Sequence, residues 1–405
     1  MRRRWSWHLG LGRELGNVFW AMVGIEGAFG SYMSIWPLWI EALGAPVTIV
    51  GLVLGSSGFL RLLSLGPSAS LAERFGIRRL ILIARVIAGL GMLSAAFATH
   101  WTQLFIMVVG SAIGELAFPL TQTHVSAHAG ANRVRAFTLT FNIGPAVAFA
   151  ISPLVSGAMV AIWGMRAAFV LAACCTAVSL FFFSRMSSAR PVKSSAEATT
   201  SNYRETLRDG TVRRLLALQF AAIFAMALGT SFVPTFLADV RGLAPATITT
   251  IGAMGATGSV LFGLCVARLT RLQQEPLLGI AIAIGLVATS LTVFALGDAL
   301  WLIVIAFLGR GGLFSAWGLF IAALSEVTDE RHRARAFALC EMMGGTAFSF
   351  APMLAGTLYA VRPVLPLAVA TGVILLLIPV VLLVQHRLGR FGGRVVIPQI
   401  EPEIA

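Results

Sequence analysis

Apolar residues gather in twelve long runs along the chain, and short segments rich in Arg, Gly and Pro separate these runs. Each run extends over roughly 20 residues, which is the length that an α-helix needs to cross the hydrocarbon core of a bilayer. Membrane-spanning strands would instead be about ten residues long with alternating polarity. The pattern therefore predicts an all-α integral membrane protein. Its twelve predicted transmembrane helices occupy residues 17–41, 46–66, 79–98, 101–123, 136–160, 164–184, 213–237, 246–267, 277–297, 300–323, 336–360 and 363–385.

The chain repeats part of its sequence at a distance of 200 residues. Arg133–Leu139 reads RVRAFTL, and Arg333–Leu339 reads RARAFAL. At the same offset, Trp101 and Trp301 begin the apolar runs that precede the two copies. A repeat on this scale indicates two related, pseudosymmetric six-helix bundles. Paired bundles are the arrangement by which membrane transporters expose one midplane site first to one face and then to the other.

One polar segment separates the two predicted bundles. Residues 187–212 are rich in Ser, Thr and charged side chains, whereas the other connections are short. Part of this segment, Tyr203–Arg208, is expected to form a short helix on the membrane surface. The predicted organisation is an N-terminal bundle at 1–186, a cytoplasmic linker at 187–212, a C-terminal bundle at 213–390 and a cytoplasmic tail at 391–405.

Composition and charge placement support a membrane location. Hydrophobic residues make up 58% of the chain, charged residues only 12%, and the mean hydropathy is +0.87, whereas a soluble domain carries about a quarter charged residues. The net charge of +13 would by itself suggest a nucleic-acid partner. However, 24 of the 30 Lys and Arg residues fall on the face that both termini share, three on the opposite face and three inside the runs. This asymmetry predicts cytoplasmic termini in an inner membrane, and no nucleic-acid partner is expected.

The chain offers no pattern typical of a cofactor, a metal centre or an enzyme. Its cysteines lie inside apolar runs without metal-ligand or redox spacing, at Cys174, Cys175, Cys265 and Cys340. A phosphate-binding Gly-rich loop with Lys is missing, which argues against ATP coupling. The short connections leave no room for a soluble catalytic domain. We therefore expect neither metal nor cofactor, and a monomer whose partners are a small molecule, protons and the bilayer.

The loop after the second run carries a recognisable motif. Ala69–Arg79 reads ASLAERFGIRR, which resembles the G-x-L-A-D-R-x-G-R-R loop of the major facilitator superfamily. Ala69 stands in place of the first Gly, Glu73 in place of the Asp, and Ile77 at one of the Arg positions. The motif also lies between the second and third predicted helices, as it does in that family. The resemblance implies a transporter with twelve helices in two bundles, cytoplasmic termini and a midplane cavity.

Charged loops of this kind can stabilise one conformation of a transporter. An acid and several arginines at a helix-loop-helix junction can pair with each other and with neighbouring helix ends. The alternative is that these residues are ordinary cytoplasmic charges that obey the positive-inside rule. We expect a conformational latch at the motif and at the repeated loops, formed by Glu73, Arg74, Gly76, Arg78, Arg79, Arg133, Arg135, Arg333 and Arg335.

Two features bear on the subtype within the superfamily. The fifth run, from Gly144-Pro145 to Gly157, resembles a degraded form of the G-P-x-x-G-G signature of antiporters. Small residues here also have a packing explanation. Drug–proton antiporters usually carry an Arg in the fourth helix, where this chain has Ile106 and Met107 before Gly110, with an acid, Glu115, further along. The nearest Arg in a comparable setting is Arg310, in the opposite half. The chain thus resembles bacterial drug/proton antiporters without their usual relay residue.

Charged residues inside the apolar runs are candidates for function, because a charge at the bilayer centre costs about 3 kcal/mol. Glu26 and Glu115 lie deep in the first and fourth runs, and Glu341 lies about five residues into the eleventh. A carboxylic acid away from water holds its proton more readily, so all three are candidate proton carriers. Glu26 also has a structural alternative, as a protonated Glu bonded to a neighbouring helix, and Glu341 has one as a partner of Arg335.

Three arginines fall inside the runs. Arg310 is expected to make an ionic contact with one of the acids across the interface between halves, without a preferred partner. Arg61 and Arg85 lie within two turns of a cytoplasmic helix end, where snorkelling of the side chain to the surface would suffice.

The remaining cavity candidates are mostly aromatic. The expected substrate-cavity residues are Glu26, Glu115, Arg310, Trp20, Tyr32, Trp36, Asn142, Phe224 and Trp317. Such a lining suits a lipophilic or amphipathic compound, and the sequence therefore favours proton-coupled export by alternating access. The alternatives are an uptake carrier or lipid transporter of the same fold, a non-transporting sensor on that fold and, remotely, a membrane-embedded enzyme.

Overall fold

The computed structural model of the protein describes residues 7–65, 68–130, 133–187 and 203–391, and within these ranges every regular element is a helix. The first half contains α1 Gly12–Tyr32, α2 Trp36–Ala42, α3 Val47–Leu65, α4 Ser68–Phe75, α5 Ile77–Phe97, η1 Trp101–Gln103, α6 Leu104–Gly114, α7 Ala117–His128, α8 Arg133–Phe137, η3 Thr138–Ile143, α9 Gly144–Trp163 and α10 Arg166–Ser184. The second half contains α11 Tyr203–Thr206, α12 Gly210–Thr230, α13 Val233–Asp239, α14 Pro245–Arg268, α15 Thr270–Gln274, α16 Pro276–Leu296, α17 Leu300–Arg310, α18 Gly312–Val327, α19 Glu330–Val361 and α20 Leu365–Phe391.

The predicted all-α membrane architecture is confirmed. Ten described helices are long and apolar enough to cross a bilayer, and the bent pair α1 and α2 would make eleven. The remaining predicted run coincides with α3, which is apolar over the shorter stretch Val47–Leu60. Each of the twelve predicted runs thus falls on a helix or on an interrupted helix. Of the short helix expected at Tyr203–Arg208, the structure shows α11 over Tyr203–Thr206, and its place on a membrane surface stays a prediction. Residues 188–202 lie outside the described part of the chain.

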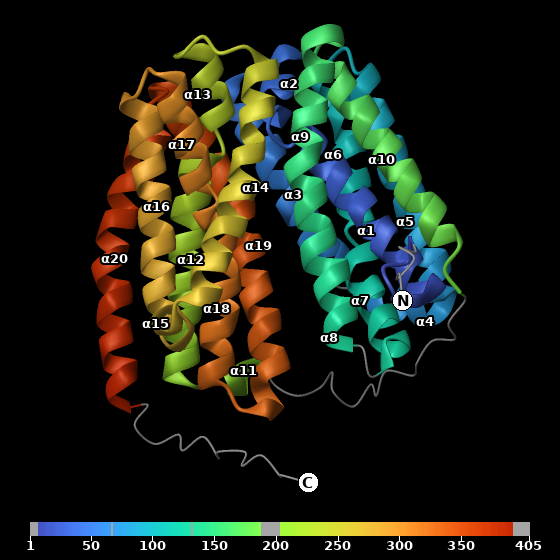
Figure 1. Ribbon diagram of the computed structural model, residues 1–405. Helices are drawn as coiled ribbons and strands as arrows, with labels where there is room; N and C mark the ends of the chain where they lie inside the picture. The colour runs from blue at the N-terminus through green and yellow to red at the C-terminus, as the bar shows by residue number, and fades with distance from the viewer. Residues whose placement is uncertain (1–6, 66–67, 131–132, 188–202, 392–405) are drawn as a thin grey trace, which may run out of the picture.

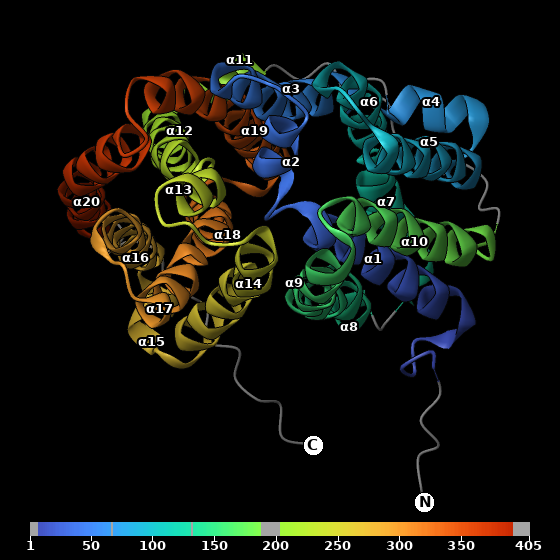
Figure 2. The ribbon, with the colours of Figure 1, turned by 90° about the horizontal axis from the view of Figure 1, so that it is seen from above.

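The helices form two groups that lie side by side (Figure 1). Figure 2 shows α1 and α4–α10 on one side and α12–α20 on the other. In the first group α1 packs against α9 and α10, and α5 packs against α6 and α10. In the second group α12 packs against α18, α19 and α20.

The first and seventh spans are interrupted at matching places. The axis bends by 51° between α1 and α2, and α12 gives way to α13 after two turn residues. Both restarting helices have a proline in the first turn, Pro37 in α2 and Pro234 in α13. Proline lacks a backbone N–H and fits the first turn of a helix, where that N–H would have no intrahelical partner. The sequence therefore encodes the same break in both halves.

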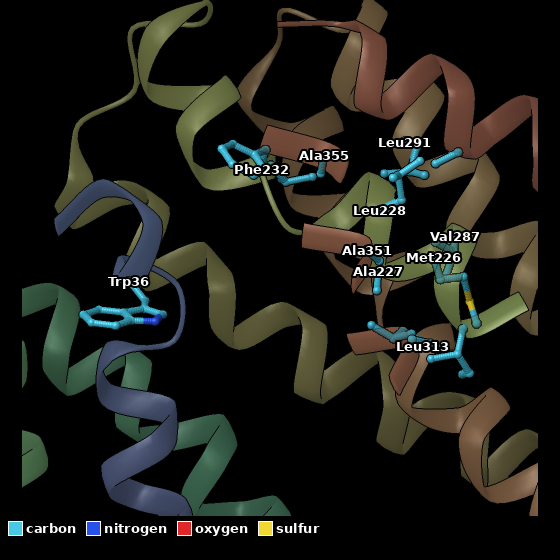
Figure 3. Close-up of a cluster of buried hydrophobic side chains, with 14 of the residues drawn as sticks. Trp36, Met226, Ala227, Leu228, Phe232, Val287, Leu291, Leu313, Ala351 and Ala355 are labelled. Carbon is cyan, nitrogen blue, oxygen red and sulfur yellow. The ribbon is translucent and has the colours of Figure 1, made fainter. Parts of the chain in front are cut away.

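The core of the second half surrounds α12. Met226, Ala227 and Leu228 of this helix are all at most 2% exposed. In Figure 3 their side chains lie among residues of α16, α18 and α19, labelled Val287, Leu291, Leu313, Ala351 and Ala355. Apolar packing of α12 against α16, α18 and α19 stabilises the second half.

Small residues form the seam between the two groups, where α3 packs against α19 and α9 packs against α14. A Cβ added to Gly51 would lie 2.5 Å from the Pro352 carbonyl oxygen. A Cβ on Gly55 would overlap the Ser349 carbonyl oxygen, and one on Gly157 would overlap the Thr250 hydroxyl. Glycine at these positions is what allows the helices to approach so closely.

The seam lies toward the end of the molecule that is remote from α11. Gly51 is near the start of α3 and Gly356, which it faces, is near the end of α19. The helices of the two groups converge at this end and diverge toward the end where α11 lies (Figure 1). About midway along the spans, the rings of Phe149 and Phe314 meet across the seam with centroids 6.0 Å apart.

A bulky residue in the seam should open the closed end. Overpacking costs about 1–3 kcal/mol, so Gly55→Leu, whose side chain would collide with Ser349, should raise the open population by about tenfold. Opening is measured with Ser34→Cys, introduced into a variant without the native cysteines, because Ser34 lies against Gly252 of the other half. We expect a membrane-impermeant maleimide to label this cysteine faster when Gly55→Leu is present. Gly372→Leu is the matched control, since nothing lies within 4 Å of a Cβ there; equal rates in both variants would contradict the seam's role.

Candidate functional site

Two of the predicted proton carriers are brought together inside the first half. Glu26 lies in the middle of α1, and Glu115 lies where α6 ends and α7 has yet to begin. The charges of both carboxylates act on the guanidinium of Arg85 in α5 and on the hydroxyl of Tyr32 at the end of α1. These four residues, Glu26, Tyr32, Arg85 and Glu115, are called the charge cluster below.

Arg85 is an interior member of this cluster, and the expectation that it snorkels to the surface is wrong. Its exposed fraction is 5%, and its Nη2 donates to Thr176 Oγ1 of α10 at 3.4 Å. A Cβ added to Gly114 would lie 3.4 Å from Arg85 Nη1. Arg85 shares its side of α5 with the buried Ala84 and Ala88. The side chain therefore points between α6 and α10, and Gly114 leaves the space that it occupies.

Glu26 and Glu115 are both half-buried, and both lie within electrostatic reach of the buried guanidinium of Arg85. Charged side chains inside a membrane are costly, and a partner of opposite charge offsets part of that cost.

The third predicted proton carrier, Glu341, lies in the second half. Its Oε1 accepts a hydrogen bond of 2.9 Å from Trp317 Nε1, which connects α19 to α18. The Trp317 ring also lies 5.8 Å from that of Phe348 on α19. The structure thus pairs two predicted site residues with each other, and gives Glu341 an indole partner rather than Arg335.

The structure does not show the expected ionic contact of Arg310. This residue ends α17, and its guanidinium lies over the Phe307 ring at 5.6 Å. Among the described side chains, no carboxylate pairs with it. The physical reason lies in the packing of α17, whose Phe307 is fixed against Phe294 of α16 with centroids 5.1 Å apart. This contact holds the end of α17 in the second half, while Glu26 and Glu115 belong to the first.

Three of the aromatic candidates pack within the first half rather than between the halves. Trp20 Nε1 donates to the Trp7 carbonyl oxygen at 2.9 Å. The rings of Tyr32 and Trp36 lie 5.6 Å and 5.8 Å from that of Phe169 in α10. These contacts stabilise the bundle, which is the usual role of aromatic residues in a core. Two further candidates lie elsewhere: Asn142 is exposed in η3, and Phe224 packs on Phe220 within α12.

The predicted latch residues have contacts within the first half. Gly76 adopts φ 82° between α4 and α5, a conformation that favours glycine. Arg78 donates to the Ser184 carbonyl oxygen of α10, and Arg135 Nη2 donates to the Leu9 carbonyl oxygen at 2.9 Å. The other members are placed less specifically: Arg74 lies over the Phe75 ring at 5.3 Å, Arg79 is exposed, Arg333 and Arg335 are half-buried, and the side chains of Glu73 and Arg133 lie outside the described part of the chain.

One polar network was not predicted from the sequence. Glu14 Oε1, in the first turn of α1, accepts from the backbone N–H and the hydroxyl of Ser187 at 2.7 Å and 2.9 Å, and lies 2.9 Å from His124 Nε2 at the end of α7. It joins the ends of α1, α7 and α10. The sequence contained one signal for this network: Glu14 and His124 both lie at span ends on the predicted cytoplasmic face.

Comparison with known proteins identifies the fold. A sequence model described as Major Facilitator Superfamily matches residues 18–321. No curated protein matches the chain. Among solved structures, it resembles the nucleoside transporter NupG in a mutant form, with 13% identity, a TM-score of 0.76 and coverage of 94% of this chain and 100% of that one.

Two further structures show the same likeness. The POT family transporter PepTSo has 13% identity and a TM-score of 0.72, with 94% of this chain and 99% of that one covered. A bacterial homolog of the human lysosomal transporter Spinster, in an inward-facing and occupied conformation, has 16% identity and a TM-score of 0.69, with 93% and 96% covered. At these identities the likeness shows the fold, which is twelve helices in two pseudosymmetric six-helix bundles.

The charge cluster should be energetically coupled. Removing one member of a buried charge cluster costs about 3–5 kcal/mol, so Arg85→Gln should lower the apparent melting temperature of the purified protein by several degrees. Adding Glu26→Gln should recover part of that loss, because contacting charges are not additive.

The matched control for this measurement is Arg271→Gln. Arg271 forms an exposed pair with Glu275 at 3.8 Å, and surface pairs contribute at most about 1 kcal/mol. If Arg85→Gln is no more destabilising than Arg271→Gln, Arg85 does not hold the cluster together.

Proposed function

The chain belongs to the major facilitator superfamily, and we propose that it is a proton-coupled transporter that exports a lipophilic or amphipathic small molecule. It is a multi-pass membrane protein with transporters as its structural relatives, and not an enzyme. The observation that supports the coupling proposal is the charge cluster, in which the carboxylates of Glu26 and Glu115 lie within electrostatic reach of Arg85. A charge inside a membrane is costly, and such residues mark proton and substrate pathways.

The seam supports alternating access as the mechanism. We place both termini in the cytoplasm of an inner membrane, as the positive-inside asymmetry indicates. The seam through Gly51 and Gly356 then closes the outer side, and the diverging ends face the cytoplasm. The two bundles, 1–186 and 213–390, would rock about the midplane contact of Phe149 with Phe314. Arg78 and Arg135 would hold the cytoplasmic end of the first bundle together during this motion.

The charge cluster would couple this motion to protons. Glu26 and Glu115 take up a proton from the outside as the substrate leaves, and release it to the cytoplasm after the bundles have changed orientation. Differential proton affinity in the two orientations is what allows a proton gradient to shift their populations. The aromatic side chains of Phe149, Phe314 and Trp317 near the midplane support an apolar or amphipathic substrate.

Reconstitution into proteoliposomes that contain a pH-sensitive dye tests the coupling. Three aromatic probes of different charge would be supplied in turn, namely 1-naphthylacetate, 1-naphthylacetamide and ethidium. We expect at least one probe to cause a proton flux opposite to its own movement. Glu26→Gln should abolish this proton flux while leaving passive exchange of the probe, because a glutamine retains the shape of the side chain but cannot carry the proton.

The control for this experiment is Glu275→Gln, which alters an exposed carboxylate at the end of α15. It should behave as the wild-type protein does. The proposal fails if probe movement ignores the pH gradient, or if Glu26→Gln transports protons as well as the wild type.

A further inference from the structure

Arg310 presents a guanidinium group whose N–H donors have no acceptor among the described residues. Its contact within that part of the chain is the face of the Phe307 ring, 5.6 Å from the guanidinium carbon. A guanidinium has five N–H donors and stays protonated in proteins. Inside a membrane such a group normally pairs with an acid or marks the path of a substrate. Arg310 therefore calls for a partner that the described protein does not supply.

The position of Arg310 places it beside the interface between the bundles. The chain continues from α17 to α18 through Gly311, which keeps helical backbone angles of φ −57° and ψ −19°. Residues four and seven positions further, Phe314 and Trp317, therefore lie on the same side as Arg310. Phe314 meets Phe149 of the first bundle with ring centroids 6.0 Å apart. Arg310 is thus one helical turn from a contact between the two bundles.

The carboxylate of Glu341 is not suited to neutralise Arg310. It is held by Trp317 Nε1 at 2.9 Å, and Trp317 is seven residues beyond Arg310, which is about 10 Å along a helix. Because Glu341 occupies the indole N–H, Trp317 offers an aromatic face to any bound molecule.

We propose that Arg310 binds the anionic group of the transported molecule, a carboxylate, sulfonate or phosphate, while Phe149, Phe314 and Trp317 contact its apolar body. This inference rests on the proposed transport function and narrows the substrate class to amphipathic organic anions. A guanidinium is planar and forms bidentate hydrogen bonds with such anionic groups. The Phe307 ring lies beside the guanidinium, and none of the described residues accepts a hydrogen bond from its N–H groups.

The charges of the two bundles would orient such a substrate. Glu26 and Glu115 in the first bundle repel an anionic group, whereas Arg310 in the second attracts it. The anionic end therefore lies toward α17 and the apolar end toward the first bundle. Proton and substrate then occupy different bundles, and each binding event affects the other through the movement of the bundles.

Calorimetric titration of the purified protein in detergent tests the proposal with probe pairs that differ only in charge. The pairs are 1-naphthylacetate with 1-naphthylacetamide, and naphthalene-1-sulfonate with its sulfonamide. We expect the wild-type protein to bind at least one anion about tenfold more tightly than its neutral counterpart. Arg310→Met, which keeps the length and apolar character of the stem, should abolish this preference.

Further variants distinguish loss of the anion site from a folding defect. Arg310→Gln provides a second neutral variant, and both are checked for monodispersity before titration. Arg310→Lys should keep part of the preference for anions, because lysine retains the positive charge but lacks the planar guanidinium group. Arg268→Gln is the control, because Arg268 is exposed at the end of α14, and it should leave the preference unchanged.

The outcomes separate this inference from the transport proposal. A wild-type protein that binds neither anion more tightly than its neutral counterpart overturns the anion site, as does a preference that survives in the folded neutral variants. The titration needs no pH gradient, so a failure of proton coupling would leave its result intact. Conversely, a protein without the anion site can still be tested for proton coupling with ethidium and the amide, which carry no anionic group.

Discussion

The cost of holding charge within a hydrocarbon layer is the constraint on which this structure depends. A membrane helix can carry Glu or Arg only where other protein groups, water or a ligand offset the lost hydration. In the first bundle the offset is internal, since Arg85 lies within electrostatic reach of Glu26 and Glu115 and also bonds Thr176. In the second bundle Glu341 is held by Trp317. In both bundles, polar groups of a neighbouring helix therefore accompany the acids of the apolar spans.

The two bundles share the positions of their helix interruptions but differ in the charged residues that they carry. Each has an interrupted first helix with a proline at the restart, Pro37 or Pro234. The fourth and tenth spans each contain a turn, after Gly114 and after Arg310, within one continuous span. Beside these turns the first bundle has an acid, Glu115, and the second has Arg310. The helical scaffold is thus shared, while the charges that it carries differ between the bundles.

The sequence predicted the helices and their grouping in two bundles, because the length of an apolar run follows from the thickness of the bilayer. The membrane depth of Glu26 and Glu115 stays a prediction. The sequence did not predict Arg85 as an interior residue, since distance from a helix end says nothing about which side of the helix is packed. Spacing with Ala84 and Ala88 was the available signal. Neither did it predict that Tyr32 and Trp36 pack on Phe169, because contacts between helices depend on how the bundle is assembled.

The central claim is that the charge cluster of the first bundle gains and loses a proton within the working pH range of the protein. Infrared difference spectroscopy of the carboxyl stretching band, recorded while the pH is stepped through neutrality, measures this directly. The account predicts a band from a carboxyl group in apolar surroundings that changes with pH in the wild type and disappears in Glu26→Gln or Glu115→Gln. A wild-type protein without such a band, or a band that persists in both variants, would contradict it.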